Sequence, residues 1–400
     1  MRPGKPVMQC EMTTWRGRRA CLLGNENIEL THLIGGGHIV DFHFRRTGQT
    51  NPFWTPHWKT REPFDFDPGN DAGIYGSPEV GRLLSGIAGH SLCLDLFGMP
   101  SAEEVRTGGT LHGEAGVLKW NVRRNQQNAY AELHLSVALR RSALSFSRLL
   151  LLKRSESVVY VRETVRNERP IDQFFQWQQH ATFGAPFLSR DCAVALPGRR
   201  GITSPSGYDG RELLKGNTEF LWPYAPRFDR GRVDLRRALT TPGRGFVAGV
   251  QIDPDREHAF VCVSNPRSRL AIGYCFRRED FPWIALWEEN VARKSSPWKG
   301  LEKTRALEFG SSPLPLSRAE NFQLGALFDT PTLAHVPAKG TRTACYVLFL
   351  ARLPLGTRTI ADVAIGARSI DLIGPSGTLA CSLPSAAIQK FLGRSEARTG

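Results

Sequence analysis

Apolar and polar residues alternate over much of the chain, which is typical of β-strands with one face packed and the other in water. The alternation is sustained from Leu118 to Thr164, where polar turns divide it into a predicted meander of antiparallel strands. A second pattern, from Ile28 to Phe44, predicts two strands joined across a triple glycine. Further strands are predicted at residues 245–252, 258–263, 269–276, 283–287, 304–309, 343–350, 359–365 and 369–372.

Helical periodicity is scarce, and only two short helices are predicted, near residues 317–328 and 385–392. Residues 61–80 read as a loop, and residues 189–245 as a long irregular excursion. The fold class is therefore predicted to be mainly β, a large antiparallel β-sandwich. Because no linker or internal repeat interrupts the pattern, we expect one domain over residues 1–400, with a core at about 25–352, a short N-terminal extension and C-terminal strands with a tail.

Composition and charge narrow the classes of partner that this chain is expected to bind. A chain of 400 residues that is 41% hydrophobic and 22% charged is a folded globular protein. The net charge of +14 raises the question of nucleic acid binding. However, the arginines occur as doublets scattered along the whole chain, without a basic helix or zinc-finger spacing, so nucleic acid is not expected as a partner.

The expected cellular location and the expected lack of cofactors rest on signals that the sequence does not contain. No apolar run approaches the length of a membrane span, the N-terminus carries no export signal, and none of the eight cysteines forms a C-x-x-C pair. A reduced, cytoplasmic location without membrane contact is therefore expected. No metal or other cofactor is predicted, because His38 and His43 point to opposite faces of a strand and His57 is isolated. The oligomeric state cannot be read from the pattern.

Candidate chemistry centres on Phe174 to Leu188, an aromatic strand that carries His180 and then turns at glycine and proline. A histidine at such a turn can point into a cleft, although it can equally be a buried histidine bonded to a backbone carbonyl. A second histidine, His112, stands in the motif LHGEAG. The aromatic loop Asn51 to Trp58 either covers the end of a sheet or forms a wall for a ligand. The triple glycine is not a phosphate loop, because no helix follows it.

These motifs, in this order, resemble those of the aldose 1-epimerases, the galactose mutarotases and their wider β-supersandwich superfamily. The resemblance runs from about residue 28 to 350 and includes GRLLSGI, LHGEAG with a tryptophan after it, and QHATFGAPFL. It implies that His112 positions a sugar, that His180 is the acid for the ring oxygen, and that Arg82 matches the first arginine of the family motif. The catalytic glutamate of the family has no equivalent near Lys339, and its substrate-binding arginine falls on Gly86.

A substitute carboxylate would then have to serve as the base. Glu288 and Glu289 follow an apolar strand, Glu308 ends another, and Glu114 lies beside His112. The alternative interpretations are a solvated acidic turn for the first two and an ion pair with an arginine for Glu308. Aromatic side chains that could form the walls of a sugar site, or simply belong to the core, are Trp177, Trp283 and Trp287.

Two functions remain open. The first is an isomerase of the aldose 1-epimerase type, which binds a sugar or sugar acid in a concave cleft and interconverts its anomers by histidine and carboxylate acid-base catalysis. The second is a noncatalytic carbohydrate-binding or sensing protein that has lost the base. A lyase or hydrolase on the same sandwich is a weaker third reading. A carboxylate about 5–8 Å across a cleft from His180 would favour the enzyme.

Overall fold

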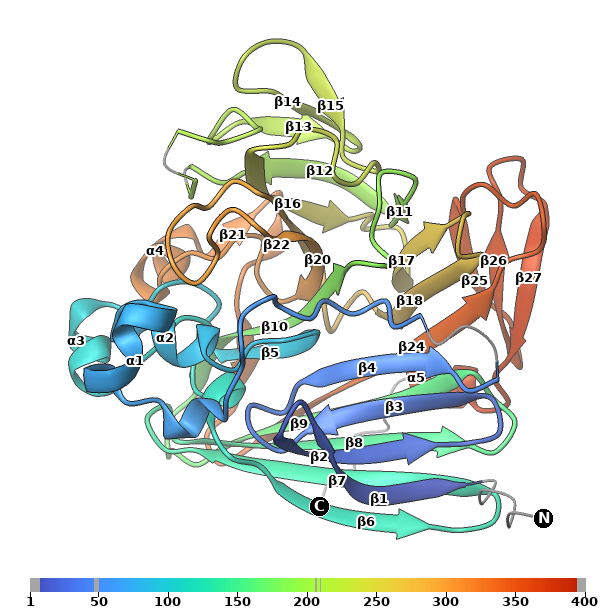
Figure 1. The fold of residues 1–400 in the computed structure, drawn as a ribbon, viewed down its shortest axis with the longest axis horizontal. Coiled ribbons are helices and arrows are strands. Elements are labelled where there is room, and N and C mark those ends of the chain that lie inside the picture. Colours follow the sequence, from blue (N-terminus) through green and yellow to red (C-terminus); the bar gives the residue numbers. More distant parts are fainter. Residues whose placement is uncertain (1–7, 47–49, 206, 209, 394–400) are drawn as a thin grey trace.

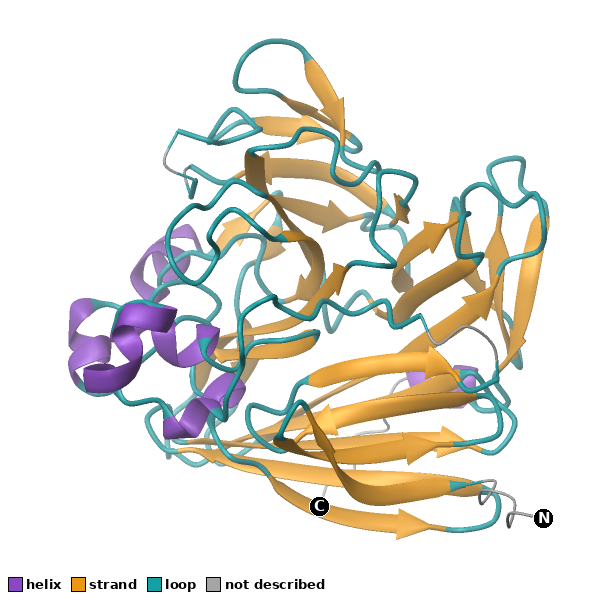
Figure 2. Ribbon diagram, viewed as in Figure 1, coloured by secondary structure: helices purple, strands orange, loops and turns teal. Residues whose placement is uncertain are grey.

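Two large antiparallel sheets form the body of the computed structural model, which describes residues 8–46, 50–205, 207–208 and 210–393 (Figures 1 and 2). The first sheet has twelve strands. In sheet order they are β1 (Gln9–Trp15), β2 (Arg18–Gly24), β3 (Ile28–Leu33), β4 (Ile39–Phe44), β5 (His90–Asp95), β10 (Gln173–Gly184), β20 (Lys303–Gly310), β19 (Trp283–Asn290), β16 (Arg244–Ile252), β12 (Gly198–Thr203) and β13 (Glu219–Leu221), and β23 (Ala334–Val336) pairs with β10.

The second sheet has eight strands and lies against the first (Figure 1). In order they are β11 (Ala193–Ala195), β17 (His258–Asn265), β18 (Leu270–Arg277), β24 (Thr341–Arg352), β9 (Val158–Asn167), β8 (Leu144–Lys153), β7 (Tyr130–Leu139) and β6 (Asn121–Gln126). Strands β7 and β8 bury every second side chain, as the sustained alternation predicts. The prediction of a mainly β, antiparallel sandwich is confirmed.

The main core lies between the two sheets and takes apolar side chains from both, such as Leu30 and Leu307 from the first and Val161 from the second. A buried polar network also joins the layers. The Glu163 carboxylate on β9 accepts hydrogen bonds from Arg148 Nε at 2.7 Å and Gln179 Nε2 at 2.6 Å. Because every charged group in this network is paired, the network can tolerate burial, and it fixes β10 against the second sheet.

Smaller elements decorate the sandwich. A three-stranded sheet of β25 (Asp362–Ile365), β26 (Ser369–Ile373) and β27 (Leu379–Pro384) packs with helix α5 (Ile388–Leu392) against the eight-stranded sheet, on the right of Figure 1. Two short hairpins, β14 (Tyr224–Pro226) with β15 (Arg232–Asp234) and β21 (Ala326–Leu327) with β22 (Thr330–Pro331), lie within the longer connections. The remaining helices are α1 (Pro68–Tyr75), α2 (Pro78–Leu84), α3 (Ala102–Arg106) and α4 (Arg318–Leu324), with short 3-10 turns at Pro63–Asp65 and Ala115–Val117.

The two helices predicted near 317–328 and 385–392 are confirmed as α4 and α5. The prediction that residues 61–80 form only a loop was wrong, because α1 and α2 begin there. The predicted N-terminal extension was also wrong for residues 9–24, which form β1 and β2 at the edge of the first sheet. Residues 1–7 and 394–400 lie outside the described residues. None of the described helices is long and apolar enough to span a membrane.

Candidate functional site

His180 lies in the middle of the first sheet, on the face that points away from the second sheet. Its neighbours Trp177 and Gln179 point the other way, since both donate hydrogen bonds to Glu163 on β9. Because side chains alternate along a strand, His180 projects from the opposite face. The register of β10 and β20 places Glu308 directly beside it. The structure therefore brings together two of the residues singled out from the sequence.

His180 and Glu308 form a closely coupled pair. The Nε2 atom of His180 lies 3.3 Å from Glu308 Oε1, and its Nδ1 atom lies 2.8 Å from the Thr182 hydroxyl. The two residues are only 4% and 2% exposed. Among the described residues, no other charged partner lies within ion-pair distance of the Glu308 carboxyl. The alternative of an ion pair between Glu308 and an arginine is thus not what the structure shows.

Burial controls the protonation of this pair. It raises the pKa of Glu308 well above its ordinary value. Burial also lowers the pKa of His180 well below its ordinary value, and the neighbouring His112 adds to this shift. Both shifts favour the uncharged forms, in which the proton of the pair lies on the carboxyl and the imidazole is neutral. In this state His180 Nδ1–H donates to Thr182, an assignment made from the hydrogen-bond network.

His112 faces the same pair from the turn between α3 and the 3-10 turn Ala115–Val117. Its ring centroid lies 5.1 Å from that of His180. The residue adopts a φ of 65°, and Gly113 follows at 75°, so the chain reverses sharply at this point. Its Nδ1–H donates to the Phe97 carbonyl at 2.7 Å, while Nε2 has no hydrogen-bond partner among the described residues. Burial lowers the pKa of His112 to about 4, so at neutral pH its Nε2 carries a free lone pair.

A group of tryptophans packs against His180. The ring of Trp287 lies 5.8 Å from that of His180. Trp287 packs with Trp54, Trp58 and Trp298, and we call these four residues the tryptophan cluster. The Arg293 guanidinium lies over the Trp287 and Trp298 rings, at 5.7 and 5.1 Å from their centroids. Trp54 and Trp58 come from the aromatic loop 51–58, which therefore covers this face of the sheet.

The other two acidic candidates on β19 point to opposite faces. The Glu289 carboxylate accepts hydrogen bonds from the backbone N–H groups of Ala292 and Arg293, at 2.5 and 3.1 Å, and so holds the turn that carries Arg293. Its Oε2 atom is buried without a hydrogen-bond partner. Glu288 forms a buried ion pair with Arg305 at 3.1 Å on the other face. Neither residue is the solvated acidic turn of the alternative interpretation, and Glu288 does not face His180.

Among the described residues, three further predicted side chains make no hydrogen bond, ion pair or ring contact with the histidines. Trp177 is buried between the sheets, on the opposite face of β10 from His180, so it is not a wall of this site. Trp283 is fully buried and donates its indole N–H to the Pro331 carbonyl at 2.8 Å. Both are core residues, as the alternative interpretation held. Arg82 lies on α2, half-buried, without a hydrogen bond or ion pair of its side chain among the described residues.

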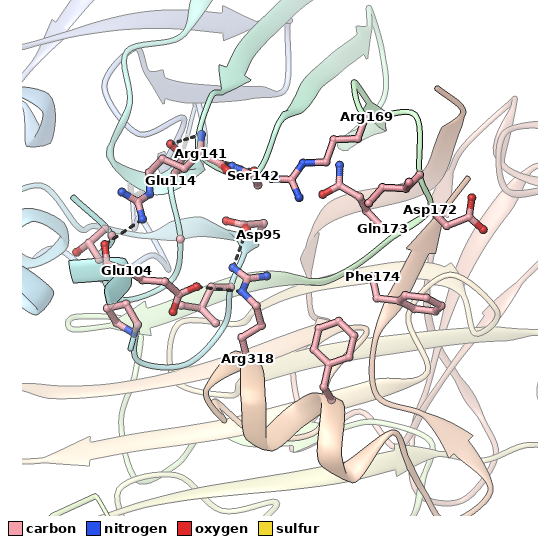
Figure 3. Close-up of a pocket in the computed structure, with 17 residues that line it drawn as sticks. Asp95, Glu104, Glu114, Arg141, Ser142, Arg169, Asp172, Gln173, Phe174 and Arg318 are labelled. Carbon is pink, nitrogen blue, oxygen red and sulfur yellow. Dashed lines mark hydrogen bonds and ion pairs between the residues drawn. The ribbon is translucent and has the colours of Figure 1, made fainter. Parts of the chain in front are cut away.

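A cavity of about 430 Å³ lies beside this site, at the ends of β5 and β10 (Figure 3). Gly113 and Glu114, the residues after His112, line it, whereas His180 and Glu308 do not. The Glu114 carboxylate accepts hydrogen bonds from the backbone N–H groups of Arg141 and Ser142. Among the described residues, no group of three or more His, Cys, Asp or Glu side chains is arranged as a metal site.

The sequence matches no protein-family model and none of the curated protein sequences. The fold, however, is similar to that of several solved structures. A candidate aldose 1-epimerase from Klebsiella pneumoniae subsp. pneumoniae superposes with a TM-score of 0.58 at 14% identity, over 84% of this chain and 80% of that one. A candidate mutarotase from Salmonella typhimurium gives 0.55 at 11% identity, over 88% and 96%. A galactose mutarotase-like protein from Clostridium acetobutylicum gives 0.53 at 11%, over 86% and 99%.

Proposed function

We propose that this protein, whose fold is that of the galactose mutarotase-like proteins, binds a sugar or sugar acid against β10 and β20 and interconverts its anomers. The observation that carries this proposal is the contact between His180 and Glu308, at 3.3 Å, on the same face as His112. Paired groups whose environments shift their protonation are typical of acid-base sites. The fold supports a carbohydrate as the ligand, and the reaction type rests on these three side chains.

The reaction would open and reclose a cyclic hemiacetal. Opening requires a base for the anomeric hydroxyl proton and an acid for the ring oxygen. His112 is suited to the base because its Nε2 lone pair is free. The His180–Glu308 pair is suited to the acid because it holds a proton that burial keeps on the carboxyl. After the transfer, the imidazolium of His112 would lie next to the new negative charge of the pair, which stabilises both.

The contact differs from the arrangement that would have favoured the enzyme. That arrangement is a carboxylate about 5–8 Å across a cleft from His180. Glu308 touches His180 instead, so no sugar ring fits between them, and they act on one side of the substrate. His112 then has to remove the proton of the anomeric hydroxyl, which makes it a base and not only a positioning residue. Glu289 is proposed to act through the turn that it holds, by keeping Arg293 over the tryptophan cluster.

Anomer exchange, followed by exchange NMR on a panel of aldoses and uronic acids, tests this proposal. Glu308→Gln and His112→Ala should each slow exchange by about a hundred- to ten-thousand-fold, the range for one acid or base. Glu103→Gln is the control, because this carboxylate is strongly exposed and has no role in the proposed reaction. This variant should catalyse anomer exchange at the wild-type rate. Full activity in Glu308→Gln would refute the proposed role of the pair.

The pH dependence gives a second readout. His112 accepts a proton only while it is neutral, and its pKa lies at about 4. Exchange should therefore stay constant as the pH falls from 7 to about 5 and should drop as the pH passes through about 4. An enzyme whose base were an ordinary histidine would lose activity already near pH 6.5.

A noncatalytic carbohydrate-binding protein is the second candidate, and one observation favours it. His180 and Glu308 are almost completely covered, so a ligand can reach them only if Arg293 or the tryptophan cluster moves. Sugar binding to the wild-type protein without any anomer exchange would select this function over the isomerase.

A further inference from the structure

The cavity beside His112 is built from side chains that the proton-transfer site does not use. It lies where β5 ends and β10 begins, between α3 and α4, and Figure 3 shows charged groups from several elements pointing into it. Its volume of about 430 Å³ is within the range of small-molecule sites. The turn that carries His112 also contributes Thr110, Gly113 and Glu114 to the cavity wall.

A carboxylate and a guanidinium form its polar centre. Arg318 Nη2 donates to Asp95 Oδ2 at 2.7 Å, and Arg318 Nε donates to Glu104 Oε1 at 3.0 Å. Asp95 Oδ1 and Arg318 Nη1 have no partner among the described residues, although Asp95 is itself buried. An acceptor and a donor thus stand side by side at the cavity wall. Two neighbouring hydroxyl groups, one donating and one accepting, match this pair.

Two aromatic rings flank this polar centre. Phe174 and Phe322 line the cavity and are 48% and 49% exposed, with ring centroids 6.2 Å apart. Large aromatic side chains that remain half in water mark binding surfaces when they cluster. A flat apolar ring face can pack against the C–H face of a sugar while the hydroxyls reach the charged pair.

The charges around the cavity argue against an anionic ligand. Three arginines face four carboxyl groups: Arg141, Arg169 and Arg318 against Asp95, Glu104, Glu114 and Asp172. The Arg141 guanidinium is already bound to the Thr107 and Glu104 carbonyls. No net positive charge is therefore available for a phosphate or carboxylate, whereas a neutral polyhydroxyl compound can use both signs.

We propose that this cavity is a second carbohydrate site, which binds a neutral sugar unit through Asp95 and Arg318 and stacks it on Phe174 and Phe322. The site requires no proton transfer, so it goes beyond the proposed function and stands without it. Its position next to the His112 turn suits a ligand of more than one sugar unit.

Saturation-transfer NMR and calorimetry with maltose, lactose and cellobiose test the site, with glucose 6-phosphate as the anionic probe. At least one disaccharide should bind the wild-type protein. Asp95→Asn should weaken that binding about tenfold, through loss of a charged hydrogen-bond acceptor. The double variant Phe174→Ala/Phe322→Ala should weaken it similarly and should fold normally because both rings are half exposed. Phe228→Ala, at a more exposed ring elsewhere, should have no effect.

The outcomes separate this site from the proposed catalysis. Glu308→Gln should retain disaccharide binding even where it abolishes anomer exchange. The proposal is overturned if no disaccharide binds, if only glucose 6-phosphate binds, or if the Asp95 and phenylalanine variants bind as tightly as the wild type. It is also overturned if sedimentation shows that the double phenylalanine variant changes the oligomeric state instead, since the rings then serve a protein interface.

Discussion

At the residue scale, burial decides which form each histidine takes. His90 is completely buried between the sheets, with Nε2 lying 3.0 Å from Gln179 Oε1 and Nδ1 lying 3.0 Å from the Tyr274 hydroxyl. A neutral ring satisfies both contacts, because Nε2–H donates to the amide oxygen while Nδ1 accepts from the hydroxyl. A protonated ring would turn Nδ1 into a donor. Burial, together with the charge of Arg148, lowers the pKa of His90 to about 3.

This histidine should make stability depend on pH. As the pH falls below about 6.5, the unfolded chain takes up a proton at this position while the folded chain does not, so the free energy of unfolding decreases down to about pH 3. The His90→Gln variant has no imidazole at this position, so it lacks this pH-dependent loss of unfolding free energy. We expect the variant to have a lower free energy of unfolding than the wild type, and we expect this difference to shrink by about 2 kcal/mol between pH 7 and pH 5. Urea titrations at both pH values measure it, and an equal deficit at both would contradict it.

At the element scale, two hairpin turns offer a matched comparison. Gly17, between β1 and β2, has a φ of 81° and open space around it. Gly37, between β3 and β4, has a φ of 65°, and a Cβ there would lie 2.4 Å from the Trp120 ring. Both glycines need the left-handed region, but only Gly37 also needs the space.

Alanine at each position should separate these two effects. Gly17→Ala should cost about 1 kcal/mol of unfolding free energy, from backbone strain alone. Gly37→Ala should cost more, by about 1–3 kcal/mol, because the buried Trp120 ring must shift. Chemical denaturation of the two variants gives the difference directly. Equal losses would mean that the ring moves freely.

Other elements show which parts of the structure could be predicted from the sequence. The meander over 118–164 was predictable because its strands are neighbours along the chain and each has one clear apolar face. Helix α3 was missed although Ser101 and Glu104 form a capping box, because the helix is too short to show periodicity. The predicted histidines lie together, but the contact between His180 and Glu308 depends on the register of β10 with β20, two strands far apart in sequence. No local pattern encodes such a register.

At the scale of the whole molecule, the C-terminal sheet shares its packing with the sandwich. Ile370 and Leu372 of β26 belong to the same buried cluster as Phe349 of β24. The Tyr160 hydroxyl on β9 lies 2.7 Å from the Ser385 hydroxyl that follows β27. These contacts lead us to propose that residues 8–393 unfold as one cooperative unit, in line with the single domain expected from the sequence.

Ile370→Ala should therefore lower one common thermal transition, with a loss of about 2–5 kcal/mol for a buried aliphatic side chain. Leu355→Ala is the control, because that side chain is 88% exposed and precedes the same sheet. Calorimetry that resolves two transitions, of which only one moves in Ile370→Ala, would show that the C-terminal sheet is an independent domain.

The tryptophan cluster has a practical consequence. Its indole rings are packed at centroid distances of 5.2 to 6.4 Å, with Trp54 and Trp298 almost parallel. Rings this close share their electronic excitation, and the imidazole of His180 lies against one of them. A compound that reaches Glu308 has to move either this arrangement or the Arg293 guanidinium that lies over the Trp287 and Trp298 rings. We therefore expect the intrinsic fluorescence and near-ultraviolet dichroism of the protein to report occupancy without an added label.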